Sequence, residues 1–200
     1  MNKSKILNIS SNSWLVEIDD FFLQSSVSYY GLNNLVPHYS RASAIIKGRT
    51  IDISGMTRHS IDSLAESCRL LYGLLHQRYV ITDDGIRRVY HKYQRGVYGC
   101  CPRIACNKKH LIPMGITEEP GKEKVKCWCP NCHDIYETDT EIDGAYFGPD
   151  LPIMFHKINN IPLKYKAFCP FLKNVENETE EVPEIPQRLY RWGEQVPQPE

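Results

Sequence analysis

Two pairs of cysteines in this chain have the residue type and spacing of metal ligands. Cys101 and Cys106 form the first pair, Cys129 and Cys132 form the second, and twenty-two residues separate the two pairs. Each pair can close a tight turn, and a hairpin between them can bring the four sulfurs into a tetrahedron. Zinc prefers four thiolates in such closed sites, which leave no coordination position open for a reaction. The pattern therefore predicts a structural zinc site.

Neighbouring residues compete for these ligand positions. Cys100 adjoins Cys101, Cys127 lies two residues before Cys129, and His133 directly follows the second pair. We choose Cys101 and Cys129 because a proline follows each of them. Proline fixes φ and removes an amide donor, so the two turns would begin alike.

A disulfide framework is the alternative use of the thiols, since eight cysteines could form four bridges. Residues 1–8 carry no apolar core of signal-peptide length, and no stretch approaches the roughly 20 apolar residues of a membrane span. We therefore expect a reducing location, cytoplasmic and nuclear, with no membrane partner. Cys68 lies in a helical pattern and is expected in the core. The roles of Cys100, Cys127 and Cys169 stay open.

The chain carries 24 basic and 24 acidic side chains, so its net charge gives no general attraction to nucleic acid or membrane. The distribution is uneven, because residues 87–126 hold ten lysines or arginines and only three glutamates. Residues 176–184 hold five glutamates and no basic residue. The basic zone 87–126 is either a solvated face that offsets the negative charge of a zinc tetrathiolate, or a surface for polyanions or acidic proteins.

Hydrophobic periodicity predicts helices in the first hundred residues. Apolar side chains recur at three- and four-residue steps over residues 60–79, with Ser60 as the cap. A second helix is predicted from its cap, Thr82, to Gly96. Two shorter helices and a loop of mixed charge complete this part, at residues 21–31, 37–48 and 48–59.

The second half of the chain is richer in glycine and proline. Residues 124–129 alternate with a period of two, and a turn at 119–122 joins them to an extended segment at 110–116. Further strand candidates lie at 134–136 and 153–155. These features predict a zinc ribbon, a sheet too thin to be stable without its metal. In zinc-finger peptides the metal supplies about 10–16 kcal/mol of apparent binding free energy.

The predicted fold class is α+β, with an all-helical domain at 1–97, a small zinc-ribbon β domain at 98–166 and an extended tail at 167–200. The tail is spaced by prolines, yet it contains Leu189, Tyr190 and Trp192. These large apolar side chains either pack back onto the ribbon or anchor another protein, since aromatic residues often dominate interface energies.

Several motifs occur in order and resemble the regulatory beta subunit family of casein kinase II. The motifs are VPHY at 36–39, LYGLLHQRYVIT at 71–82, YGCCPR at 98–103, DGAYFG at 143–148 and PQRLY at 186–190. The two cysteine pairs have the family's spacing. The resemblance spans roughly residues 14–192 and implies the family's fold and role.

The resemblance implies a ligand set and a homodimer. The zinc ligands would be Cys101, Cys106, Cys129 and Cys132. The family dimerises through its zinc ribbon, so residues 98–166 would be the dimerisation domain. By alignment its apolar seam would contain Pro102, Ile104, Ile116 and Ile135.

The resemblance also implies a docking segment in the tail. The family presents aromatic side chains there to the kinase catalytic subunit, and Leu189, Tyr190 and Trp192 fall on that segment. Trp192 stands where the family usually has phenylalanine, which would enlarge the anchor. The implied assembly is a heterotetramer with two catalytic chains on one dimer, and protein substrates and regulators would be further partners.

Two departures from the family concern regulation. The family's long acidic loop is replaced here by residues 48–55, which carry little negative charge. The family's N-terminal serines are followed by acidic residues, whereas Ser4 lies between lysines and Ser10, Ser11 and Ser13 lack an acidic residue three positions on. We therefore do not expect acidic-loop regulation or N-terminal autophosphorylation of the family's kind.

These observations predict a non-catalytic regulatory subunit of a casein kinase II-type serine/threonine protein kinase, which docks, stabilises and modulates the catalytic subunit and its substrate choice. The sequence has no glycine-rich phosphate loop followed by lysine, no His-Arg-Asp and no Asp-Phe-Gly, so it is not expected to be an enzyme itself. The alternative function is a zinc ribbon that binds nucleic acid through the basic zone 87–126. Nucleic acid is not the expected partner, because the ribbon lacks the basic-aromatic interleaving of single-strand binders. A thiol enzyme using Cys100 or Cys127 with a histidine is a third hypothesis.

Overall fold

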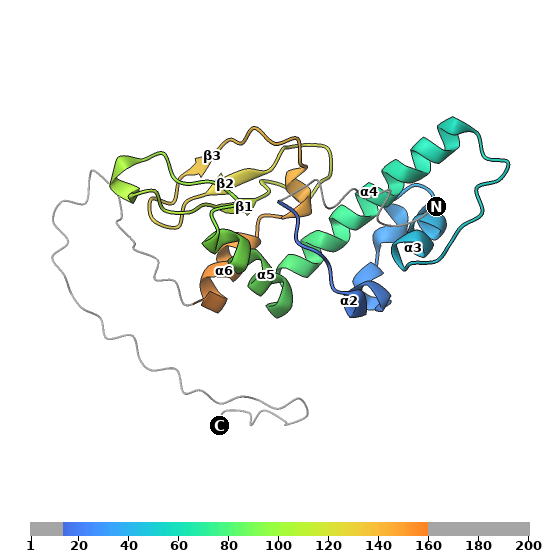
Figure 1. Cartoon of the computed structure of the whole chain (residues 1–200), viewed down its shortest axis with the longest axis horizontal. Helices are drawn as coiled ribbons and strands as arrows, with labels where there is room; N and C mark the ends of the chain where they lie inside the picture. The colour runs from blue at the N-terminus through green and yellow to red at the C-terminus, as the bar shows by residue number, and fades with distance from the viewer. Residues whose placement is uncertain (1–13, 160–200) are drawn as a thin grey trace, which may run out of the picture. The chain divides into compact units, whose positions relative to one another are not determined.

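The computed structural model describes residues 14–159, in which four α-helices precede a small three-stranded sheet and a fifth follows it (Figure 1). The α-helices are α2 (Asp20–Gln24), α3 (Tyr39–Ile46), α4 (Arg58–Val80), α5 (Asp83–Gln94) and α6 (Leu151–Asn159). The 3-10 helices are η2 (Val27–Tyr29), η3 (Leu32–Asn34), η4 (Ile104–Cys106) and η5 (Gly144–Tyr146). The strands are β1 (Ile112–Met114), β2 (Lys126–Trp128) and β3 (Ile135–Tyr136). Helices together with a small antiparallel sheet confirm the predicted α+β class. Within 14–159 no helix is both long and apolar enough to cross a membrane.

Helix α4 begins at Arg58 rather than at the predicted Ser60. Thr57 has extended backbone, and its side-chain oxygen accepts a hydrogen bond from the backbone N–H of Ser60 at 3.2 Å. Thr57 is therefore the cap, and Ser60 is the third residue of the first turn. The apolar period places Leu64 and Cys68 in the core, and every residue from Leu71 to His76 is buried.

A tight corner joins α4 to α5. Thr82 caps α5 as predicted, because its side chain accepts from the N–H of Gly85 at 3.2 Å. A Cβ on Gly85 would overlap the backbone carbonyl oxygen of Tyr79, so only glycine permits this close approach. Ile86 and Val89 of α5 are then fully buried.

The helix predicted over 21–31 is instead broken into α2, η2 and part of a loop. Asp19 caps α2 by accepting from the N–H of Phe21 at 2.7 Å, but Ser25 at its other end is extended. Gly31 then has a positive φ of 75°. Serine competes for local backbone hydrogen bonds and glycine favours turns, and these residues divide the apolar pattern.

The sheet has the order β1-β2-β3, and both pairings are antiparallel. Pro113 lies opposite Cys127 on one side of β2, and Tyr136 lies opposite Cys127 on the other. The central strand β2 thus leads directly to Cys129, whereas β1 follows the first cysteine turn and β3 follows the second.

The strand predicted at 153–155 is wrong, because these residues lie in α6. Short apolar runs do not distinguish a strand from a buried helix. Here Leu151 and Phe155, one helical turn apart, are both fully buried, while Ile153 between them is exposed. Helix α6 packs against α5 and against β1.

One hydrophobic core extends across residues 14–159 and includes side chains from the helices and from the ribbon. The ring of Tyr146 in η5 lies against Gly73 of α4, where a Cβ would overlap it. Nearby, His76 of α4 is fully buried: its Nε2 accepts from the N–H of Val16 at 3.0 Å, and its Nδ1 donates to the carbonyl of Tyr146 at 2.6 Å. These contacts join both sides of residue 97, and the division into domains at 1–97, 98–166 and 167–200 stays a prediction.

Candidate metal centre

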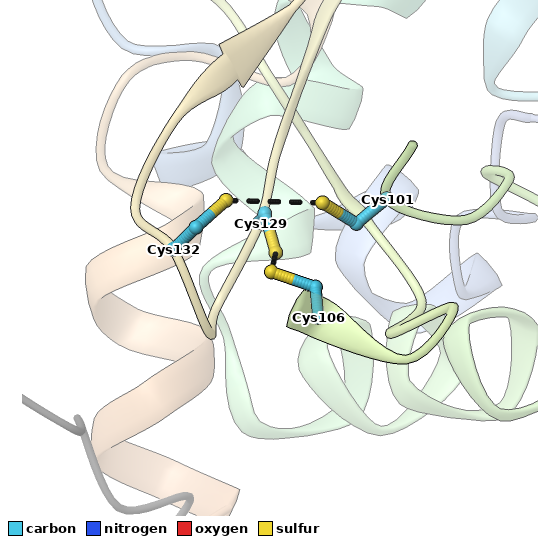
Figure 2. A group of neighbouring side chains, drawn as sticks. All are labelled: Cys101, Cys106, Cys129 and Cys132. Carbon is cyan, nitrogen blue, oxygen red and sulfur yellow. Dashed lines mark hydrogen bonds between the residues drawn. The ribbon is translucent and has the colours of Figure 1, made fainter. Parts of the chain in front are cut away.

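Four thiols converge at one end of the ribbon, as Figure 2 shows. Cys101 and Cys106 come from the segment before β1, and Cys129 and Cys132 follow β2. Their four sulfur atoms all lie within 4.8 Å of one another. These are the same four residues that the sequence selected, and three of them are buried while Cys132 is partly exposed.

The spacing of the sulfurs fits a tetrahedral metal site. Cys101 and Cys132 have their sulfurs 3.8 Å apart, and those of Cys106 and Cys129 are 3.9 Å apart. Metal–sulfur bonds of about 2.3 Å in a tetrahedron separate the sulfurs by about 3.8 Å. The seven cysteines within 14–159 are free thiols, so the cluster is not a disulfide framework. The four thiols could therefore hold a metal ion.

Local backbone bonds shape the first turn. The N–H of Cys101 donates to the carbonyl of Lys109 at 2.8 Å, and the N–H of Lys109 donates to that of Cys106 at 3.0 Å. Asn107 and Lys108 both adopt positive φ, at 48° and 52°, which reverses the chain between these bonds. Residues 107–108 thus close the turn, and asparagine at position 107 is a residue type that tolerates the left-handed backbone conformation.

The second turn is closed in a similar way. The N–H of Cys129 donates to the carbonyl of Asp134 at 3.0 Å, and the N–H of His133 donates to that of Cys129 at 2.9 Å. The N–H of Asn131 points at the sulfur of Cys129 at 3.4 Å. Such amide donors stabilise negative charge on a sulfur, so the turn is suited to a thiolate.

Polar contacts also join the two turns. Arg103 of the first turn and Asp134 of the second form an ion pair at 2.5 Å. The hydroxyl of Tyr136 lies 3.3 Å from the sulfur of Cys101 and 3.3 Å from that of Cys132. The sequence analysis missed these three residues, because no local pattern indicates which polar side chains reach across to the other turn.

The local environment changes the acidity of the thiols in opposite directions. Burial raises the pKa of Cys101, but hydrogen bonds from the Tyr136 hydroxyl and the Arg103 backbone outweigh it and lower this pKa to about 7. Burial raises the pKa of Cys129 to about 12. Because a metal binds the thiolate, its binding must displace the proton of Cys129, and acid will favour metal release.

The competing thiols lie outside the cluster. Cys100 is exposed, and its backbone pairs with that of His110 in an isolated bridge. Cys127 is buried on β2, where its sulfur lies 3.5 Å from the carbonyl of Tyr98 and burial raises its pKa to about 12. A nucleophilic thiol needs a lowered pKa and access to solvent, so Cys127 does not suit the thiol-enzyme hypothesis.

The residues predicted for the dimer seam lie on the surface of the described chain. Ile104 is 97% exposed, Ile116 and Ile135 are each 47% exposed, and Pro102 is exposed. Ile104 and Ile135 each follow one member of the Arg103–Asp134 ion pair, so they belong to the same end of the ribbon. Their role in a dimer stays a prediction.

The residues predicted to dock the catalytic subunit, Leu189, Tyr190 and Trp192, lie outside the described residues. The predicted tail at 167–200 lies there as well.

The sequence of this chain is similar to that of one known protein family. The sequence model described as Casein kinase II regulatory subunit matches residues 3–185. Casein kinase II subunit beta-2 of Schizosaccharomyces pombe is 36% identical over 161 residues, which cover 74% of this chain and 63% of the relative. Casein kinase II subunit beta of the same organism is 34% identical, covering 76% of this chain and 67% of the relative.

A third relative, casein kinase II subunit beta' of Saccharomyces cerevisiae, is 34% identical over 74% of this chain and 60% of its own length. Across these three relatives the chain spans between 60% and 67% of the relative's length. The family model is described as a regulatory subunit, and the three relatives are named as beta subunits of casein kinase II.

Proposed function

The chain belongs to the casein kinase II regulatory subunit family, and from that premise we propose that it is a non-catalytic regulatory subunit of a casein kinase II-type serine/threonine protein kinase. The single observation that carries this proposal is the family match over residues 3–185, which includes all four clustered cysteines. In this role the protein docks and stabilises the catalytic subunit and modulates its choice of protein substrates. It acts in the cytoplasm and the nucleus, together with protein regulators.

The metal of the proposed subunit is zinc, bound by Cys101, Cys106, Cys129 and Cys132. Sulfur separations of 3.8 and 3.9 Å support this assignment, and four thiolates are a donor set that zinc prefers. With all four positions filled by the protein, the ion supplies structural stability and no reaction. Its role is to hold the two turns and the short strands between them in one arrangement.

The proposed subunit is a homodimer whose seam lies on the zinc ribbon. Exposed apolar side chains at Ile104, Ile116 and Ile135, beside Pro102, support this location, because clustered apolar exposure marks interaction sites. Pro102 and Ile104 lie in the first cysteine turn and Ile135 lies directly after the second, so the metal would hold this part of the interface in shape. Two catalytic chains on one such dimer give the proposed heterotetramer.

Docking to the catalytic subunit is assigned to Leu189, Tyr190 and Trp192. This part of the proposal rests on the family membership and on the residue types, since aromatic side chains supply much of an interface's binding energy.

Nucleic-acid binding through the basic zone 87–126 is not favoured. Five of the ten basic residues in this zone form ion pairs with acidic side chains within 14–159: Arg87, Arg103, Lys122, Lys124 and Lys126. Paired cations have less charge available for phosphates, and the names of the relatives refer to a kinase subunit.

Mixing with a casein kinase II catalytic subunit tests the proposal. The wild-type chain should co-elute with the catalytic subunit in size-exclusion chromatography, and Tyr190→Ala/Trp192→Ala should weaken binding at least about a hundredfold, because two aromatic anchors are lost. A control that removes two aromatic side chains exposed within 14–159, Phe21→Ala/Tyr30→Ala, should bind like the wild type.

The two variants separate the parts of the proposal. Absence of any binding by the wild-type chain would overturn the regulatory role. Equal binding by the wild type and the Tyr190→Ala/Trp192→Ala variant would overturn only the docking assignment.

A further inference from the structure

Tyr136 contacts the metal centre without being one of its four cysteines. Its hydroxyl lies 3.3 Å from the sulfurs of both Cys101 and Cys132, which are themselves 3.8 Å apart. These two sulfurs come from different turns. A thiolate has no proton to donate, so in the metal-bound form the tyrosine hydroxyl must be the donor, and its single proton is shared between the two sulfurs.

The sheet fixes the position of this hydroxyl. Tyr136 is the last residue of β3, and it lies opposite Cys127 in the antiparallel register. Its backbone is thus paired with the strand that leads into Cys129. The donor is therefore positioned by the register of the sheet, directly after the second cysteine turn.

The contacted pair includes the least buried cysteine of the centre. Three of the four cysteines are buried, whereas Cys132 is only partly so. Release of a metal ion to a competing ligand begins with the loss of one thiolate, and the least buried one is the easiest to reach. The hydroxyl of Tyr136 is placed on this thiolate and on its neighbour Cys101.

The ion pair between the turns does not bond these two sulfurs. Arg103 and Asp134 pair with each other at 2.5 Å, and this contact can hold the turns together. The hydroxyl of Tyr136 differs from this ion pair because it contacts one sulfur from each turn.

We propose that Tyr136 is a positioning residue of the metal centre, which holds the thiolates of Cys101 and Cys132 at tetrahedral separation and slows their exchange for outside ligands. This inference rests on the zinc centre of the proposed function. A hydrogen bond to a ligand atom stabilises its negative charge and restricts its orientation, and loss of such outer partners typically weakens metal binding about 10- to 100-fold. Tyr136 thereby makes the centre resistant to competing thiols and chelators.

Metal transfer to a coloured chelator tests the proposal on the full-length protein. Zinc-loaded Tyr136→Phe should bind one zinc ion but transfer it at least about tenfold faster than the wild type. The matched control is Tyr29→Phe, which removes a buried hydroxyl bond to the carbonyl of Leu23 at 2.9 Å in the helical part. Tyr29→Phe should transfer zinc at the wild-type rate.

Cobalt substitution gives a readout that general loosening of the fold would not change. A hydrogen bond lowers the energy of the sulfur electrons, so its loss should move the sulfur-to-cobalt charge-transfer band of Tyr136→Phe to longer wavelength. The bands that report tetrahedral geometry should stay in place, and the Tyr29→Phe spectrum should match the wild type. Circular dichroism verifies that both variants are folded.

The outcomes distinguish the role of Tyr136 from the existence of the zinc centre. If Tyr136→Phe matches the wild type in both transfer rate and charge-transfer band, the role of Tyr136 is refuted and the zinc centre stands. If the wild-type protein binds neither zinc nor cobalt, the zinc centre itself is refuted, and the role of Tyr136 with it.

Discussion

At the scale of single residues, His76 links three distant segments by bonds that only a neutral ring can make. Its Nε2 accepts from Val16 and its Nδ1 donates to Tyr146. Burial lowers the pKa of His76 from its usual 6.5 to about 4, although the bond to Tyr146 acts in the opposite direction. Protonation would remove the acceptor that holds Val16, so the charge state of this residue is coupled to folding.

This coupling predicts a pH dependence of stability. As pH falls, the unfolded chain takes up the proton near pH 6.5, while the folded chain does so only near pH 4. Neutral His76 therefore makes its full contribution to the free energy of unfolding above pH 6.5. This contribution is lost between pH 6.5 and 4, at roughly 1.4 kcal/mol per pH unit. Urea unfolding at pH 7 and pH 5 should show that wild type loses about 2 kcal/mol more stability than His76→Gln.

Exposed His59 at the start of α4 provides the control. His59→Gln should keep the wild-type change between the two pH values. Metal release in acid affects all three proteins, so the comparison isolates His76. If His76→Gln loses as much stability as the wild type, the linkage to this residue is wrong.

At the scale of elements, η5 can pack closely against α4 because α4 has a glycine, which carries no side chain, at the point of contact. Gly73 lies inside α4, where glycine costs about 1 kcal/mol relative to alanine. The ring of Tyr146 fills the space that a Cβ at this position would occupy. This contact explains why the motifs at 71–82 and 143–148, which are far apart in sequence, occur together: each supplies one side of the same junction.

Gly73→Ala should therefore destabilise the protein although alanine favours helix. We expect a loss of about 1–3 kcal/mol in the free energy of unfolding, as for other overpacked positions, measured by urea denaturation. In a Tyr146→Leu background the same substitution should cost less than in the wild type, because the ring no longer occupies the space. Equal costs in the two backgrounds would show that the ring contact is not responsible.

At the scale of the whole molecule, the four clustered cysteines of the proposed metal centre and the helices are parts of one core within 14–159. Helix α6 packs against both α5 and β1, and η5 packs against α4. Loss of the metal should therefore lower the stability of the helices as well as that of the ribbon. The proposed dimer seam lies next to the cysteine turns, so it should be lost at the same time.

Removal of one ligand tests this coupling. Cys129→Ser should lose stoichiometric zinc, lower the thermal midpoint as a single transition by more than about 10 °C, and give the monomer mass in light scattering. Cys100→Ser changes an exposed thiol outside the cluster and should keep the zinc, the midpoint and the dimer mass. A dimer mass that persists in Cys129→Ser after zinc loss would refute the link between metal and seam.

Local features of the sequence were sufficient for part of this structure. The spacing of the two cysteine pairs selected the four residues that cluster, because each pair closes its own short turn. The period of 60–79 and the cap at Thr82 predicted most of α4 and α5, since these signals act over one or two helical turns. The motifs also indicated the protein family, and the comparisons with known proteins confirm it.

Only the tertiary structure decided the remaining features. Residues 153–155 form part of a helix because Leu151 and Phe155 are buried together against α5 and the sheet, which a short apolar run does not encode. The bond from Tyr136 to two sulfurs and the neutral state of His76 depend on segments separated by tens of residues in the chain. Such contacts arise from how elements pack, whereas caps, turns and ligand spacing arise from neighbours in sequence.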